Sequence, residues 1–69
     1  MIKVTSISLP GHKVYLNPFW IESVMNNIKT GETEIFVHGD YDNPYIVAES
    51  VEEIVDRIED DRWEVSISQ

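Results

Sequence analysis

The clearest hydrophobic pattern in the chain lies in its C-terminal third and is helical. Ser50 is a favourable N-cap residue, and Glu53, three positions later, can complete a capping box. The residues that follow place apolar side chains at the i, i+3, i+4 and i+7 positions of one amphipathic stripe, namely Val51, Ile54, Val55 and Ile58. We therefore predict a helix from Val51 to about Glu59 that packs on a hydrophobic core.

Short runs of β-branched and aromatic residues predict strands elsewhere in the chain. The predicted strands are Ile2–Leu9, Lys13–Leu16, Thr33–Val37, Pro44–Ala48 and Trp63–Ile67. The alternation within the first run changes face near Thr5-Ser6, which predicts a bulge there. Turn-forming residues separate the runs at Pro10-Gly11 and at 38–43, so we expect an N-terminal hairpin and a central hairpin.

The segment from Asn17 to Lys29 allows two interpretations. Asn17 can cap a helix that has Pro18 at its first position, and Gly31 can end it. Apolar residues at helical spacing agree with this, namely Trp20, Ile21, Val24, Met25 and Ile28. The alternative is a short turn followed by a strand at Ile21–Met25. Its alternation is weaker, so the local pattern slightly favours a helix.

The order of these elements predicts the α+β class. We expect a small, strongly bent antiparallel sheet of four to five strands with one C-terminal amphipathic helix. The 69 residues, 42% of them hydrophobic, suffice for one domain covering residues 1–69. The helical stripe is expected to pack on inward-facing strand residues, namely Val4, Val14, Leu16, Ile35, Val37 and Ile46.

A chain this small depends on that core or on a partner subunit for its stability. A homo-oligomer therefore stays open as an alternative to a monomer. Residues 63–69 are expected to pair as an edge strand, either within the chain or with a second copy.

The composition excludes several classes of protein. The chain has no cysteine, which excludes disulfides, thiolate catalysis and cysteine-based zinc sites. The N-terminal residues lack the apolar run of a signal peptide, and no segment approaches the roughly 20 apolar residues of a membrane-spanning helix. We therefore expect a soluble, cytoplasmic protein.

The net charge of −8 is distributed unevenly along the chain. Lysines outnumber acidic residues before Glu32, whereas twelve of the 13 acidic residues lie from Glu32 onward, against Arg57 and Arg62. An acidic surface repels nucleic-acid phosphates, so direct binding to DNA or RNA is not expected. Such a surface attracts a protein partner that carries basic residues. The alternative is that the charge serves solubility alone.

The acidic residues are densest on the outer face of the predicted helix, which makes this face the first candidate for contact with a partner. Its residues are Glu52, Glu53, Asp56, Glu59 and Asp60. Trp20 and Trp63 are candidate anchors for the same partner, because tryptophan is enriched among the residues that dominate binding energy. The alternative for both tryptophans is burial in the core of a small domain.

Patterns for catalysis and metal binding are weak. His38, Asp40 and Asp42 alternate with a spacing that can hold a divalent cation, but the remaining ligands of a calcium loop are missing. Turn formation explains the same residues. Acid–base catalysis needs carboxyl groups held in a cleft with separated pKa values, whereas the helical carboxylates are expected to be solvated. We expect no enzyme activity, no cofactor and no bound metal.

Several short motifs together resemble one family. These motifs are the opening Met1–Thr5, Leu16-Asn17, Ile21-Glu22 and the run Val47–Glu53. They resemble the FlbD family of small bacterial flagellar and swarming-motility proteins. The resemblance covers residues 1–58 and leaves Trp63–Gln69 outside it. It implies that Ile21–Met25 is a strand, against the local helical preference, and that the protein has a role in motility.

Two functions follow as hypotheses. The first is a small, non-enzymatic regulatory or accessory protein that acts through protein–protein contacts, with a motility role as the version implied by the resemblance. The second is a phage-type inhibitor whose acidic helix mimics nucleic-acid phosphates and occupies a basic site on a host protein, with Glu52, Asp56 and Glu59 along one rigid face. The two differ in salt dependence, because charge mimicry weakens steeply as ionic strength rises.

Overall fold

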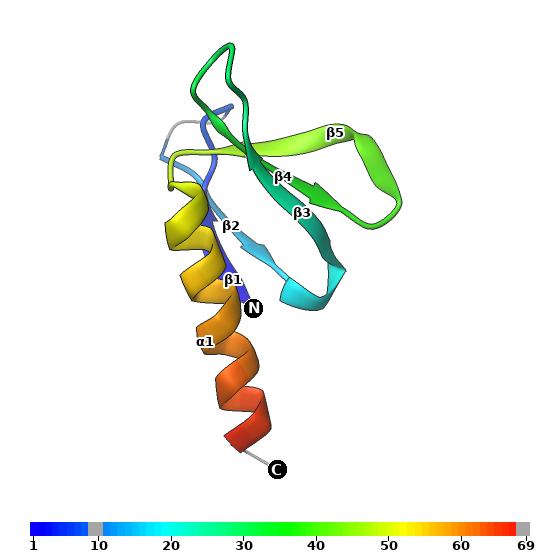
Figure 1. The fold of residues 1–69 in the computed structure, drawn as a ribbon, viewed down its shortest axis with the longest axis vertical. Helices are drawn as coiled ribbons and strands as arrows, with labels where there is room; N and C mark the ends of the chain where they lie inside the picture. Colours follow the sequence, from blue (N-terminus) through cyan, green and yellow to red (C-terminus); the bar gives the residue numbers. More distant parts are fainter. Residues whose placement is uncertain (9–10, 68–69) are drawn as a thin grey trace.

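The computed structural model describes residues 1–8 and 11–67, and within these the side chains up to residue 61. In this part of the chain, five strands and a short 3-10 helix precede one long helix (Figure 1). In chain order the elements are β1 (Ile2–Thr5), β2 (Lys13–Leu16), η1 (Pro18–Trp20), β3 (Ile21–Asn26), β4 (Thr33–Val37), β5 (Asp40–Val47) and α1 (Val51–Ile67). This arrangement confirms the predicted α+β class.

The strands form two antiparallel sheets, where the sequence predicts a single bent one. β1 and β2 form a hairpin, and β3, β4 and β5 form a three-stranded sheet in that order. The two sheets are joined where β1 ends: Ser6 forms an isolated bridge with Val47. The Ile7 N–H then donates to the Ile46 carbonyl (3.0 Å). Instead of one strongly bent sheet, the protein therefore has two sheets that are separated at the end of β1.

The first strand is shorter than predicted. β1 ends at Thr5. Ser6 still donates its backbone N–H to the His12 carbonyl across the hairpin (3.0 Å) but also bridges to Val47, so a link to β5 stands where the bulge was predicted. Ile7, which the prediction places in the strand, is exposed. The predicted turn at Pro10-Gly11 lies partly outside the described residues.

The core is formed by both sheets and α1. Ile54 is fully buried, whereas Val55, which the helical spacing assigns to the same stripe, is 39% exposed. Val47 enters the core in place of Ile46, because β5 pairs Val47 with the buried Thr33 and alternate side chains of a strand point to opposite faces. The buried hydrophobic residues are Ile2, Val4, Leu16, Ile35, Val47 and Ile54.

The segment with two interpretations contains a 3-10 turn followed by a strand. Asn17 is an N-cap, as predicted, but it caps η1: its side-chain oxygen accepts a hydrogen bond from the Phe19 N–H (3.0 Å). β3 follows, which confirms the strand implied by the resemblance and shows that the local helical preference is wrong. The segment is a strand because it pairs with β4, and such a tertiary contact overrides a local preference for helix.

The turn between β4 and β5 is also shorter than predicted. His38 and Gly39 form it, with Gly39 at φ +84°, a conformation that glycine adopts without strain. Residues 40–43, which the sequence places in the turn, extend β5 instead. Residues 38–43 therefore lie in a tight hairpin.

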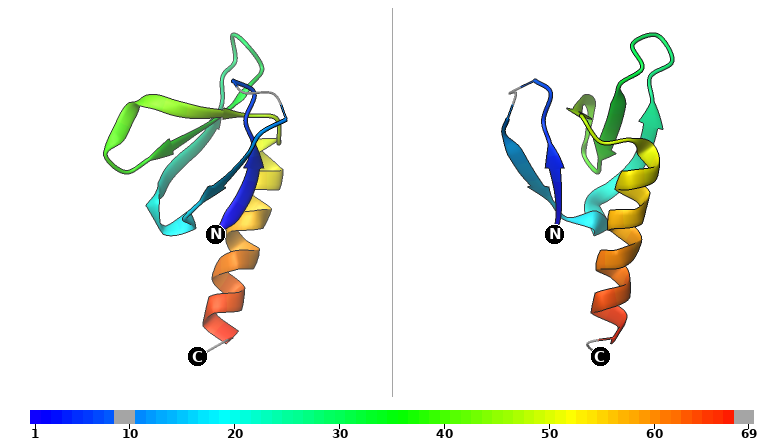
Figure 2. Two further views of the ribbon diagram at one scale, coloured as in Figure 1. Left: turned by 180° about the vertical axis from the view of Figure 1, so that it is seen from behind. Right: turned by 90° about the vertical axis from the view of Figure 1, so that its left-hand side faces the viewer.

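Helix α1 is longer than predicted. It continues to Ile67, so the strand predicted at Trp63–Ile67 is wrong; residues 68 and 69 lie outside the described part of the chain. Figures 1 and 2 show the C-terminal half of α1 projecting beyond both sheets. A strand there would have no neighbour, whereas a helix satisfies its backbone hydrogen bonds internally. The edge strand that offered a route to a dimer is thus absent from the described residues.

The predicted capping box is present at the start of α1. The Glu53 N–H donates to Ser50 Oγ (3.1 Å), and the Ser50 N–H donates to the Glu53 carboxylate (3.2 Å). Replacing Ser50 with alanine should therefore lower the free energy of unfolding by about 1 kcal/mol, measured by urea denaturation. Ser50→Asp keeps an acceptor at the cap and should lose much less; an equal loss in both variants would contradict the capping role.

Candidate interaction surface

The acidic face of α1, as we call Glu52, Glu53, Asp56, Glu59 and Asp60, is exposed as the sequence predicts. It points outward because Ile54 and Ile58 pack on the core from the other side of the helix. Glu53 also serves the fold, since its carboxylate forms half of the capping box and lies 3.9 Å from Arg57. The face therefore presents carboxylates at fixed positions on a rigid element.

A polar cluster holds α1 on β1 and so orients the acidic face. Glu49, whose side chain is only 10% exposed, accepts hydrogen bonds from the Thr5 N–H (2.9 and 3.1 Å) and the Thr5 hydroxyl (3.0 Å). Arg57 donates to the same carboxylate (2.9 Å) and to the Lys3 carbonyl (2.7 Å). These two side chains occupy the edge of β1 that β2 does not pair with, where a third strand would otherwise bind.

The same contacts keep Glu49 charged. Burial by itself raises the pKa of this carboxyl, but the hydrogen bonds from the Thr5 N–H and the Arg57 guanidinium outweigh burial. The pKa of Glu49 therefore lies below its ordinary value of 4.5. The cluster is a charged, fully formed contact at neutral pH.

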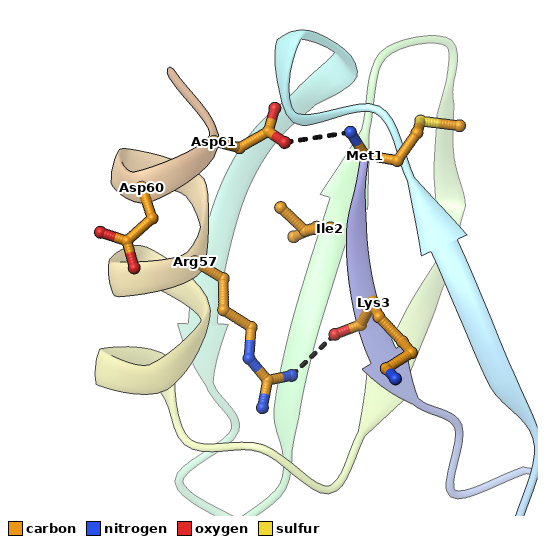
Figure 3. A pocket seen from close by; sticks show the side chains of 6 residues that line it. All are labelled: Met1, Ile2, Lys3, Arg57, Asp60 and Asp61. Atoms are coloured by element: carbon orange, nitrogen blue, oxygen red, sulfur yellow. Dashed lines mark hydrogen bonds and ion pairs between the residues drawn. The ribbon is translucent and has the colours of Figure 1, made fainter. Parts of the chain in front are cut away.

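A shallow groove of about 330 Å³ lies between β1 and α1 (Figure 3). It is lined by Met1, Ile2, Lys3, Arg57, Asp60 and Asp61. Several of its polar groups are engaged with one another: the Met1 amino group pairs with Asp61 (3.1 Å), and Arg57 donates to the Lys3 carbonyl. Asp60 points away from β1 in Figure 3. The groove thus reflects the packing of α1 on β1, and Asp60 belongs to the outer acidic face.

Of the two tryptophans proposed as anchors, the structure describes the side chain of Trp20 but not that of Trp63. Trp20 ends η1 and is 61% exposed, so the alternative of core burial is wrong for this residue. Its neighbour Phe19 is exposed as well, whereas Pro18, the first residue of η1, is buried. η1, which Trp20 ends, lies near α1. Residue 63 belongs to α1, but its side chain is outside the described part, so its anchor role stays a prediction.

A second polar cluster, which sequence reasoning missed, joins β3 to the β4–β5 hairpin. His38 Nδ1 lies 2.7 Å from Glu22 Oε1, and the Tyr41 hydroxyl donates to the same carboxylate. The hydrogen bond with His38, and then that with Tyr41, lowers the pKa of Glu22 below its ordinary 4.5, and the bond to Glu22 raises the pKa of Tyr41 above its ordinary 10.0. Trp20 adjoins the cluster, because the His38 N–H donates to the Trp20 carbonyl (2.8 Å).

Spacing along the chain gives no sign of this cluster. Glu22 and His38 are 16 residues apart and meet only because β3 pairs with β4. A correct assignment of β3 as a strand next to the hairpin would have been the one usable signal.

The metal-site hypothesis for His38, Asp40 and Asp42 gains no support from the geometry. His38 pairs with Glu22, and Asp40 accepts a hydrogen bond from the Asn43 side chain (3.3 Å). Among the side chains that the structure describes, in residues 1–8 and 11–61, no group of three or more His, Cys, Asp or Glu residues is arranged to hold a metal ion.

Residues 1–66 match the family of flagellar and swarming motility proteins, FlbD. The chain belongs to the FlbD family. The match extends past residue 58, where the resemblance noted above ends, and includes the start of the C-terminal segment that the resemblance leaves out. Searches of curated proteins and of solved structures gave no match.

For this FlbD chain, the matched range contains both the acidic face of α1 and Trp20. It also contains the Glu22–His38–Tyr41 cluster, so the candidate surfaces all lie within the family domain. Over the part that the structure describes, the FlbD chain has no helix with the length and apolar character needed to cross a membrane.

Proposed function

We propose that this protein acts in flagellar or swarming motility as a non-enzymatic accessory protein, through contact with a protein partner that carries a basic surface. The observation that carries the proposal is the family match over residues 1–66. The contact site is the acidic face of α1 together with Trp20.

Rigidity and charge support this assignment of the site. The capping box fixes the start of α1, and the Glu49–Arg57 contact fixes the helix on β1. Because the backbone of α1 is already held in place, binding orders the exposed side chains but not the helix itself. The combined charge of the acidic face accelerates the approach of a basic partner, and the exposed Trp20 offers an aromatic side chain that such a partner can bury.

The motility role is tested by swarming of a strain that lacks the gene. We expect the deletion to reduce swarming and the wild-type gene to restore it. A variant with Glu52, Asp56 and Glu59 all changed to lysine should fail to restore it, because the charge that attracts the partner is reversed. The matched control changes the same three residues to glutamine, asparagine and glutamine, which keeps their shape and removes only their charge, and should restore swarming in part.

Both variants must melt at the wild-type temperature for the comparison to count. If the deletion does not affect swarming, the motility role is wrong. If the lysine variant restores swarming fully, the acidic face is not needed for that role. A pull-down with wild type and the lysine variant then separates the two functions. Recovery of a flagellar component by wild type alone supports the proposal, whereas recovery of a nucleic-acid-binding protein by wild type alone would replace it with phosphate mimicry.

A further inference from the structure

Exposed aromatic side chains occur on two surfaces whose charges are opposite. Tyr15 is 61% exposed on β2, where its cross-strand neighbour on β1 is Lys3. Lys13 lies two residues before Tyr15 and therefore on the same face of the hairpin. The two neighbours of Tyr15 named here, Lys3 and Lys13, are both cationic, and neither offers a carboxylate.

The other surface consists of Trp20, Glu22, His38 and Tyr41, and we call it the Trp20–Tyr41 surface. Trp20 is as exposed as Tyr15, at 61%, and Tyr41 is 53% exposed. Glu22 is linked to both, directly to the Tyr41 hydroxyl and through His38 to the Trp20 backbone. Tyr41 is thus hydrogen-bonded to the Glu22 carboxylate, and the exposed Trp20 is joined to the same cluster through its backbone carbonyl.

We propose that the Trp20–Tyr41 surface binds an arginine side chain of the protein partner. The inference rests on the proposed function in that the arginine belongs to that partner. A guanidinium group stacks on the face of a tryptophan or tyrosine ring while its N–H groups donate to a carboxylate. A carboxylate has about four acceptor positions, and His38 and Tyr41 use two of them, so Glu22 can accept from a guanidinium as well.

The surrounding charge favours a cation at this surface. Asp40 and Asp42, which flank Tyr41 in β5, are exposed and add negative charge at this end of the hairpin, although successive side chains of a strand point to opposite faces. Arginine fits better than lysine, because its planar group stacks and forms paired hydrogen bonds, whereas an ammonium group is more strongly hydrated.

The test is an NMR titration of the full-length, 15N-labelled protein with an acetylated hexa-arginine peptide and, in parallel, a hexa-lysine peptide. Trp20→Phe identifies the Trp20 indole N–H signal. We expect the arginine peptide to shift this signal and the backbone signals of Glu22, His38 and Tyr41, at lower concentrations than the lysine peptide. Trp20→Ala and Glu22→Gln should each weaken binding of the arginine peptide about two- to fivefold, the size of an exposed cation–π contact or surface ion pair.

Tyr15→Ala is the matched control, since it removes an equally exposed aromatic group that is surrounded by lysines; it should leave the affinity unchanged. Arginine binding that is insensitive to Trp20→Ala and Glu22→Gln but lost in the helix lysine variant would overturn the inference and leave the acidic face of α1 as the binding site. An absence of binding, or equal affinity for both peptides, would also overturn it. Swarming of the deletion strain tests the proposed function separately, so the motility role and the arginine site can each be refuted without the other.

Discussion

Replacing Ile54 with aspartate is expected to abolish folding. Ile54 is fully buried, and among the side chains of α1 described, those up to residue 61, it alone belongs to the buried core. A carboxylate there would have no partner, and burying it, or neutralising it by protonation, costs at least about 4 kcal/mol. A core of this size rarely provides more than about 3–5 kcal/mol of net stability. Far-UV circular dichroism at room temperature should show an unfolded chain without a cooperative melt.

The matched control lies one position along the same helix. Val55 is 39% exposed, so Val55→Asp introduces the same side chain into the same helix at a position where water solvates it. This variant should fold and melt within a few degrees of wild type. A melt of Ile54→Asp that matched wild type would show that α1 does not pack on the core as described.

Replacing Glu49 with glutamine should lower the free energy of unfolding by about 1.5–3 kcal/mol, the value of hydrogen bonds to a charged group. The glutamine keeps the shape of the side chain but has one acceptor oxygen for the donors of Thr5 and Arg57, which now share the Glu49 carboxylate. Urea denaturation at neutral pH measures the loss. Glu52→Gln, the same substitution at an exposed position of α1, is the control and should change stability by a few tenths of a kcal/mol.

The stability difference between wild type and Glu49→Gln should depend on pH. The folded-state pKa of Glu49 is lowered, so its contribution to stability is fully present above its ordinary value of 4.5 and is lost as the pH falls through the lower, folded-state pKa. Wild-type stability should therefore fall on acidification, and the gap between wild type and Glu49→Gln should close. A gap that stayed constant down to strongly acidic pH would show that the charge of Glu49 is not what joins α1 to β1.

The two interaction surfaces differ in how far they could be foreseen. The acidic face of α1 follows from one local periodicity, because buried Ile54 requires that Glu52, Asp56 and Glu59 point to solvent on the same helix. The Glu22–His38–Tyr41 cluster has no such local origin. Glu22 lies on β3, whereas His38 and Tyr41 lie in the β4–β5 hairpin, and no local spacing relates the two segments.

The two errors in assigning helix and strand have one physical cause. Trp63–Ile67 alternates like a strand and Trp20–Ile28 repeats like a helix, yet each adopts the other structure for all or most of its length. A short apolar pattern is compatible with both periods. The choice depends on what lies alongside: β4 offers β3 a pairing edge, while the end of α1 extends beyond both sheets.

By itself the sequence determined the features that depend on neighbours within one or two helical turns or one hairpin. These are the α+β class, the capping box at Ser50, the buried and acidic faces of α1 and the strands of the central hairpin. The tertiary structure alone decided the separation of the two sheets, the exposure of Trp20, the hydrogen bonds of Glu49 and Arg57 to β1, and the contact of Glu22 with His38. Each of these joins segments far apart in the chain, and their meeting is set by the packing of whole elements.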